Sequence, residues 1–133
     1  VFAVPHFQSG GGRSAESAPG PVDGQPLLYE HVARLAQGPW NLNGQLGLVV
    51  GATYPNEIER VRQVAPRVPL LIPGVGAQGG DVQQIIQNGR GKASDALIIS
   101  SSRAILYAGN GPDFTEAARA AALKQRDEIN RYR

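Results

Sequence analysis

Three short segments hold the side chains best suited to chemistry, and each of them follows an apolar stretch. They are "GATYP" (51–55) with Thr53 and Tyr54, "PGVGAQGGD" (73–81) with its glycine amides and Gln78, and "SSSRAI" (100–105) with its hydroxyls and Arg103. Hydrogen-bond donors dominate the set, and Asp81 is its only carboxylate. Such a donor-rich set predicts an anionic ligand.

The glycines of residues 73–81 indicate how the backbone would hold that anion. Glycine has no Cβ, so its N–H group can approach a ligand closely, and a helix beginning behind the loop favours phosphate. Arg103 would add a charged, bidentate partner. Taken singly, these features have plainer interpretations: a tight turn, a surface arginine, and a helix cap at Asp81. Their combination on successive strands predicts a phosphate site.

The elements that position these residues alternate between helix and strand. We expect helices over 25–37, 55–66, 80–90 and 113–133, and strands over 45–53, 68–76 and 95–108, the last running into a turn. The strands are continuously apolar, which is typical of parallel strands buried on both faces. The fold class is therefore α/β, with parallel strands and helical crossovers, as a doubly wound sheet or a (β/α)8 barrel. In both folds the working residues follow the C-terminal ends of the strands.

Local patterns also predict the buried and capping residues of these helices. We expect Asp113 or Thr115 to cap the last helix. We expect apolar helix faces at Leu28, Val32, Leu35, Ala36, Ile58, Val61 and Val64.

Composition excludes several classes of protein. The 133 residues suit one domain, and the net charge of +2 comes without a basic run, so no nucleic-acid partner is expected. There is no cysteine, so neither a disulfide nor a cysteine-ligated metal is predicted. No segment has the length of a membrane span or the pattern of a signal peptide, and we expect a cytoplasmic protein without a membrane partner.

The exact sequences of three segments indicate a particular protein family, which the patterns above do not. "GLVVGATYP", "LLIPGVGAQGGD" and "IISSSRAILYA", in this order and spacing, resemble the C-terminal part of the longer bacterial orotidine 5′-phosphate decarboxylases. The resemblance runs from about Leu27 to Ala108. It implies the C-terminal part of a (β/α)8 (TIM) barrel and an enzyme, usually a homodimer, that decarboxylates orotidine monophosphate to UMP without metal or cofactor.

The resemblance also implies roles for individual residues. Gln78 and Arg103 would hold the substrate phosphate, together with backbone amides near Gly79 and Ser102. The pocket for the rest of the nucleotide would be lined by Thr53, Pro73 and Val75.

The departures from the family are equally informative. The family's catalytic centre is an array of Lys and Asp with an Asp-x-Lys-x-x-Asp motif, in which the lysine protonates the carbanion left when CO2 departs. This sequence has no such motif, and its only lysines are Lys92 and Lys124. We therefore predict no catalytic residue and no decarboxylation by this chain alone.

The chain divides into residues 1–24 and a C-terminal half-barrel over 25–133. Residues 1–4, "VFAV", resemble the family's fifth strand, but the next fourteen do not match its Thr-Ser-Asn-Pro-Gly segment. Codons chosen for residues 4–18 and read one base out of frame do encode that segment. A frameshift over residues 5 to about 20 is one hypothesis, and a divergent flexible loop is the other.

Two functional alternatives stay open beside the decarboxylase fragment. One is a non-catalytic half-barrel that binds a phosphorylated ligand or depends on a partner chain, because exposed apolar strands need cover. The other is a different phosphate-binding barrel enzyme, against which the run at residues 73–81 argues.

Overall fold

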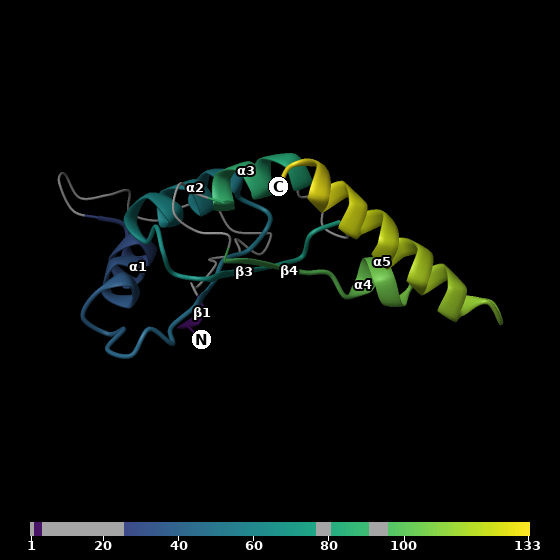
Figure 1. Cartoon of the computed structure of the whole chain (residues 1–133), viewed down its shortest axis with the longest axis horizontal. Coiled ribbons are helices and arrows are strands. Elements are labelled where there is room, and N and C mark those ends of the chain that lie inside the picture. Colours follow the sequence, from purple (N-terminus) through teal and green to yellow (C-terminus); the bar gives the residue numbers. More distant parts are fainter. Residues whose placement is uncertain (1, 4–25, 77–80, 91–95) are drawn as a thin grey trace, which may run out of the picture.

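The computed structural model describes residues 2–3, 26–76, 81–90 and 96–133, and its strands and helices alternate as predicted (Figure 1). The elements in chain order are β1 (Phe2–Ala3), α1 (Leu28–Gln37), β2 (Leu48–Val49), α2 (Pro55–Val64), β3 (Leu70–Pro73), α3 (Val82–Arg90), β4 (Leu97–Ser100), α4 (Arg103–Leu106) and α5 (Phe114–Arg131). The four strands form one parallel sheet in the order β1-β2-β3-β4. The predicted α/β class with helical crossovers is confirmed.

The strands are shorter than predicted, although hydrogen bonding continues beyond them. Two residues of β2 pair with β3, yet Val50 N donates to Leu71 O at 2.9 Å and Ala52 N donates to Pro73 O at 3.2 Å. This ladder carries the β2 segment along β3 to the point where both strands end.

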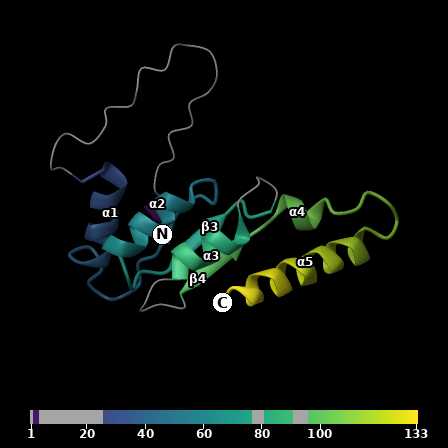
Figure 2. The same cartoon turned by 90° about the horizontal axis from the view of Figure 1, so that it is seen from above.

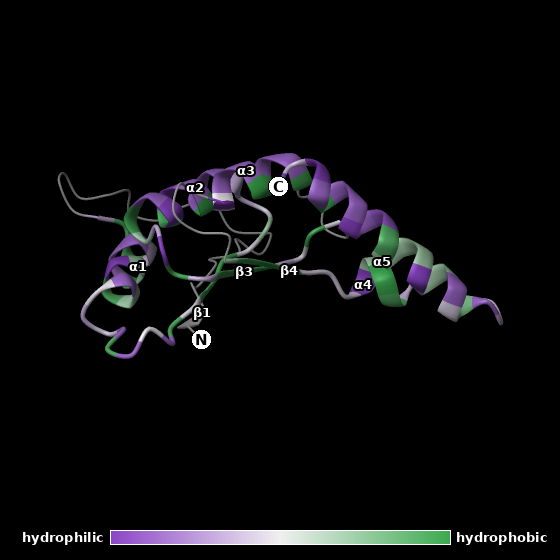
Figure 3. Ribbon diagram, viewed as in Figure 1, coloured by the Kyte–Doolittle hydropathy of each residue, from purple (hydrophilic) through white to green (hydrophobic). Residues whose placement is uncertain are grey.

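The core lies between the sheet and the helices on one of its sides. Side chains alternate across a strand, so Leu70 and Ile72 of β3 are fully buried against the helices, while Leu71 between them is half-buried. Leu71 is in register with Ile98, which is 56% exposed. The expectation of strands buried on both faces is therefore wrong for the described part of the chain. In Figure 3 the hydrophobic parts of α2 and α3 lie toward the sheet.

One local prediction about the helices is wrong, and another is met only in part. Leu28 is 70% exposed, because α1 packs on α2 further along, where Ala33 and Ala36 are fully buried. Asp113 takes the predicted N-cap position of α5 but its side chain makes no capping hydrogen bond, and the alternative, Thr115, lies inside the helix and donates its hydroxyl to Glu116. That hydrogen bond lowers the pKa of Glu116.

A buried arginine joins the ends of the helices at the other end of the sheet. Arg62 of α2 is 4% exposed, and its Nε donates to Gly89 O of α3 at 2.6 Å. Its Nη1 donates to the carbonyls of Ala65, Pro66 and Val68, at 3.2, 3.2 and 2.9 Å. Burial lowers the pKa of Arg62, and none of the ion pairs among the described residues involves it. This guanidinium therefore ties α2, α3 and the approach to β3 together.

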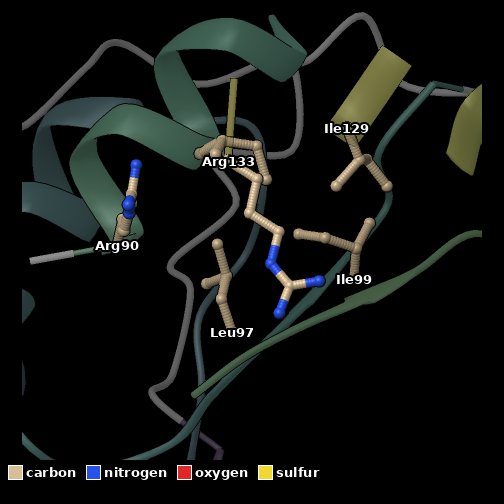
Figure 4. Close-up of a pocket in the computed structure, with 6 residues that line it drawn as sticks. Arg90, Leu97, Ile99, Ile129 and Arg133 are labelled. Carbon is tan, nitrogen blue, oxygen red and sulfur yellow. The ribbon is translucent and has the colours of Figure 1, made fainter. Parts of the chain in front are cut away.

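The last helix is the least covered element. None of the 18 residues of α5 is buried, and it contacts mainly α4 and α3 (Figure 2). Its C-terminal end meets the sheet through Ile129, which packs against the core. Figure 4 shows Ile129 and Ile99 of β4 pointing toward one another above Leu97.

Candidate phosphate site at the strand ends

Hydrogen bonds hold the C-terminal ends of β2, β3 and β4 side by side. Ala52 N donates to Pro73 O, and Gly74 N donates to Ser100 O at 3.1 Å. At the next residue of each segment, the Ser101 hydroxyl donates to Val75 O at 2.8 Å and so links the loops that follow β3 and β4. The three segments predicted to do chemistry therefore begin at one edge of the sheet.

The predicted pocket residues lie at this edge in different environments. Thr53 and Pro73 are exposed, whereas the Val75 side chain is 1% exposed and belongs to the core. Val75 presents its carbonyl to Ser101. Thr53 and Pro73 can thus contact a ligand through their side chains, while Val75 shapes the loop.

Arg103, the predicted positive charge of the site, lies at the same edge of the sheet. Ser102 and Arg103 are exposed at the beginning of α4, directly after the Ser101 that bonds the neighbouring loop. Within the described part of the chain, the two ion pairs use Arg60 and Arg126 and leave Arg103 out. Its guanidinium is therefore accessible to an anion at the strand ends.

The helix behind the glycine-rich loop contributes less than predicted. The Asp81 carboxylate accepts hydrogen bonds from Gln83 N at 2.9 Å and Gln84 N at 3.3 Å, so Asp81 caps α3. These amides already have an anionic partner, and the same carboxylate offsets the positive end of the helix dipole. The first turn of α3 therefore offers less to a phosphate than an uncapped helix N-terminus would, and Arg103 is the exposed cation at this edge of the sheet.

Gln78 and Gly79, the other two predicted phosphate ligands, lie outside the described residues. The backbone that leads to them is described as far as Gly76, whose φ of +90° is one that side-chain-bearing residues rarely adopt. Gly74, which directly follows β3, has a similar φ of +89°, so two glycines turn the chain as it leaves the strand.

We expect Gly76→Ala to lower the free energy of unfolding by about 1–3 kcal/mol, because the strain is in the backbone. A Cβ at this position would lie 3.6 Å from Ala104 Cβ, which is an ordinary contact. Gly51→Ala is the matched control, since Gly51 has no positive φ and an open surrounding, and it should change little. Urea unfolding compares them, and equal effects would contradict the assignment of strain to Gly76.

The sequence did not single out Ser101, although it joins the two loops. The available signal was a small hydroxyl-bearing residue at the end of an apolar strand, followed by the predicted Ser102 and Arg103. That pattern does not distinguish a hydroxyl that binds a ligand from one that bonds a neighbouring carbonyl.

Two other pockets lie outside the candidate phosphate site, one beside it and one at the other end of β4. One of about 520 Å³ adjoins Thr53 and is lined in part by Tyr29 and Arg60. Burial raises the pKa of Tyr29, an effect that the nearby Arg60 guanidinium partly offsets. Another, of about 140 Å³, lies at the start of β4 and carries Arg90 and Arg133 (Figure 4). It is at the opposite end of the strand from Arg103.

The described residues contain no cluster of three or more His, Asp or Glu that could hold a metal ion. Among the helices of the described ranges, none combines the length and apolar character that crossing a bilayer requires.

Comparison with known proteins identifies the family. The chain is 67% identical over 112 residues to the orotidine 5′-phosphate decarboxylase of Polaromonas naphthalenivorans (strain CJ2), a match of 84% of this chain and 39% of that relative. A second relative of that name, from Verminephrobacter eiseniae (strain EF01-2), is 70% identical over 106 residues, or 79% of this chain and 38% of its own length. No protein-family profile matches the chain.

A solved structure agrees with the sequence relatives. Leishmania donovani OMP decarboxylase superposes with a TM-score of 0.67 at 38% identity, over 82% of this chain and 40% of that one. The sheet is accordingly part of a TIM barrel, and the chain spans about two fifths of the length of the relatives it matches. The sequence identity and the superposition lead to one conclusion: the chain belongs to the orotidine 5′-phosphate decarboxylase family.

Proposed function

We propose that this chain is the phosphate-holding part of an orotidine 5′-phosphate decarboxylase, which converts orotidine monophosphate to UMP and CO2. The observation that carries the proposal is the exposed Arg103 at the joined ends of β2, β3 and β4. Phosphate sites made from the loops after late strands are common in TIM barrels, which supports the assignment.

Arg103 is the residue to which we assign the main charge contact. A guanidinium can donate two parallel hydrogen bonds to phosphate oxygens, and it stays positive at any physiological pH. Gln78 and the amides near Gly79 and Ser102 would complete the phosphate contacts. Thr53, Pro73 and the loop shaped by Val75 would border the nucleoside.

This site would act on substrate binding and not directly on the bond that breaks. Binding energy from a remote, non-reacting group such as phosphate can be used to hold the reacting carbon in a catalytic environment. The bond between the pyrimidine ring and its carboxylate breaks, CO2 leaves, and the carbanion takes up a proton. The residues for that step would come from the part of a decarboxylase that this chain does not match.

The sequence also lacks the residues that carry out the reaction in the family. The sequence has no Asp-x-Lys-x-x-Asp motif; Lys124 is exposed on α5, and Lys92 lies outside the described residues. We therefore propose that residues 1–133 alone form no UMP, that no metal or cofactor takes part, and that the complete enzyme is a homodimer.

A single-chain chimera tests the proposed function. Residues 27–133 would follow the part of the Polaromonas naphthalenivorans relative that this chain does not match, and loss of orotidine monophosphate absorbance would report decarboxylation. We expect turnover by the chimera and none by the 133-residue chain. UMP formation by the pure chain would contradict the assignment of the reacting groups, and an inactive but folded chimera would contradict the proposed function.

In the same chimera we expect Arg103→Ala to weaken the binding of UMP by about 10- to 100-fold, the equivalent of a lost hydrogen bond to a charged group of about 1.5–3 kcal/mol. Binding of uridine, which lacks the phosphate, should not change. Arg119→Ala, at an exposed position of α5, is the matched control. Calorimetric titration measures both variants and the unsubstituted chimera, and equal losses for UMP and uridine in Arg103→Ala would contradict the phosphate role.

A second candidate function is a non-catalytic half-barrel that binds a phosphorylated ligand. The missing Lys and Asp motif favours it, because Arg103 and its loop need no reacting group to bind phosphate. UMP binding by the 133-residue chain together with an inactive chimera would support this candidate.

A further inference from the structure

Arg103 begins an element that has little burial of its own to hold it in place. Helix α4 is four residues long, and none of them is buried. It contacts mainly α5, which has no buried residue either. In Figure 2, α4 lies beyond the end of β4, away from α1 and α2. The position of the Arg103 guanidinium is therefore set by the short segment that joins α4 to β4.

One side chain ties this joining segment to the loop after β3. Gly74 N donates to Ser100 O at 3.1 Å, a backbone hydrogen bond at the end of the sheet. The Ser101 hydroxyl then donates to Val75 O at 2.8 Å, in a part-buried position. Within residues 100–107, it makes the only side-chain hydrogen bond to another described segment. The Ser101 hydroxyl is thus the side-chain link between α4 and the sheet.

The acceptor of this hydrogen bond is held by the core. The Val75 side chain is 1% exposed and packs among the buried residues. A Cβ added to the next residue, Gly76, would lie 3.9 Å from Ser101 Oγ and 3.6 Å from Ala104 Cβ, so the loop passes directly beside the first turn of α4. The core therefore reaches α4 through Val75 and Ser101.

We infer that Ser101 is a positioning residue for phosphate binding: its hydroxyl fixes α4 against the loop after β3 and so orients Arg103 toward the anion. This inference rests on the proposed function, in which Arg103 is the main charge contact. A guanidinium binds phosphate best when the two groups are aligned for parallel hydrogen bonds. Without the Ser101 hydroxyl, Arg103 would occupy more positions in the free protein, and ordering it on binding would cost affinity. The hydroxyl itself stays on Val75 O and does not contact the ligand.

The test uses the single-chain chimera, with UMP and uridine as probes in calorimetric titration. Ser101→Ala should weaken UMP binding about three- to tenfold, the equivalent of one neutral hydrogen bond, and leave uridine binding unchanged. Ser101→Thr keeps a hydroxyl and should restore UMP binding. Thr115→Ala is the matched control, because the Thr115 hydroxyl donates to its neighbour Glu116 on α5, and it should leave UMP binding unchanged.

A double substitution separates positioning from a general loss of structure. If Ser101 acts through Arg103, Ser101→Ala should cost almost no further UMP affinity in a chimera that already carries Arg103→Ala. The same loss in both backgrounds would overturn the inference, because the hydroxyl would then contact the ligand itself or support the fold as a whole. Equal losses for UMP and uridine in Ser101→Ala would also overturn it.

The remaining outcomes separate this inference from the proposed function. Unchanged UMP affinity of Ser101→Ala in a chimera that decarboxylates orotidine monophosphate would overturn the inference and leave the proposed function standing. A folded but inactive chimera that binds UMP and shows the coupled losses at Ser101 and Arg103 would support the inference and contradict the proposed function. A folded chimera that binds no UMP would overturn both.

Discussion

Arg62→Met is expected to lower the free energy of unfolding of the chain by about 3 kcal/mol or more. The substitution keeps an unbranched side chain of similar length but removes every donor. The carbonyls of Gly89, Ala65 and Val68 would then lose their partner in or beside the core. Each buried carbonyl left without a donor costs about 1–3 kcal/mol.

Two effects reduce this loss of stability, so it is smaller than the sum of the four hydrogen bonds that Arg62 donates. Removing Arg62 also removes a buried charge and the Nη2 atom, which has no hydrogen-bond partner. The nearby Arg67→Met is the control, because Arg67 is exposed and its backbone N–H, which donates to Gln37, is retained. Urea unfolding followed by circular dichroism measures both variants. A loss of unfolding free energy below about 1 kcal/mol for Arg62→Met would show that the hydrogen bonds of the Arg62 guanidinium are dispensable.

Arg62→Lys extends the test. A lysine ammonium is a point donor on a flexible stem and cannot match the fork that spans Gly89 and Val68. We expect it to recover less than half of the stability lost in Arg62→Met.

Ile72→Ala is expected to cost about 2–5 kcal/mol, the range for truncating a fully buried aliphatic side chain. Ile72 is 0% exposed and lies in the core between the sheet and the helices. Ile98→Ala is the matched control, because Ile98 lies on the adjacent strand but is 56% exposed on the opposite face. In the lone chain Ile98→Ala should cost under about 1 kcal/mol. A small effect of Ile72→Ala in the lone chain, measured by urea unfolding, would contradict the core as described.

Local sequence was sufficient for the elements whose stability is local. Helices α2 and α3 lie within a few residues of the predicted ranges, because Pro55 begins one and Asp81 caps the other through bonds to its own first turn. The order of strands and helices, and the meeting of the 51–55, 73–76 and 100–105 segments at one edge, also follow from chain order and parallel pairing.

The amphipathic pattern alone could not decide which side chains become buried. Arg62 follows Ile58 by four residues on the apolar side of α2, and only the carbonyls at the end of α3 and before β3 make its burial tolerable. Leu28 has the correct spacing for a buried face but lies beyond the part of α1 that α2 covers.

The sequence by itself determined the family-specific run at 73–81, the parallel α/β order and the position of Arg103. Only the tertiary structure decided that Asp81 occupies the first amides of α3 and that the Ser101 hydroxyl joins two loops. It also decided that, among the described residues, Ile98 stays exposed on one face of the sheet and β1 and β4 each pair with a single strand. The physical reason is range. Caps and helix periodicity depend on neighbours a few residues away, whereas cover for a sheet and partners for a buried guanidinium come from segments distant in the chain.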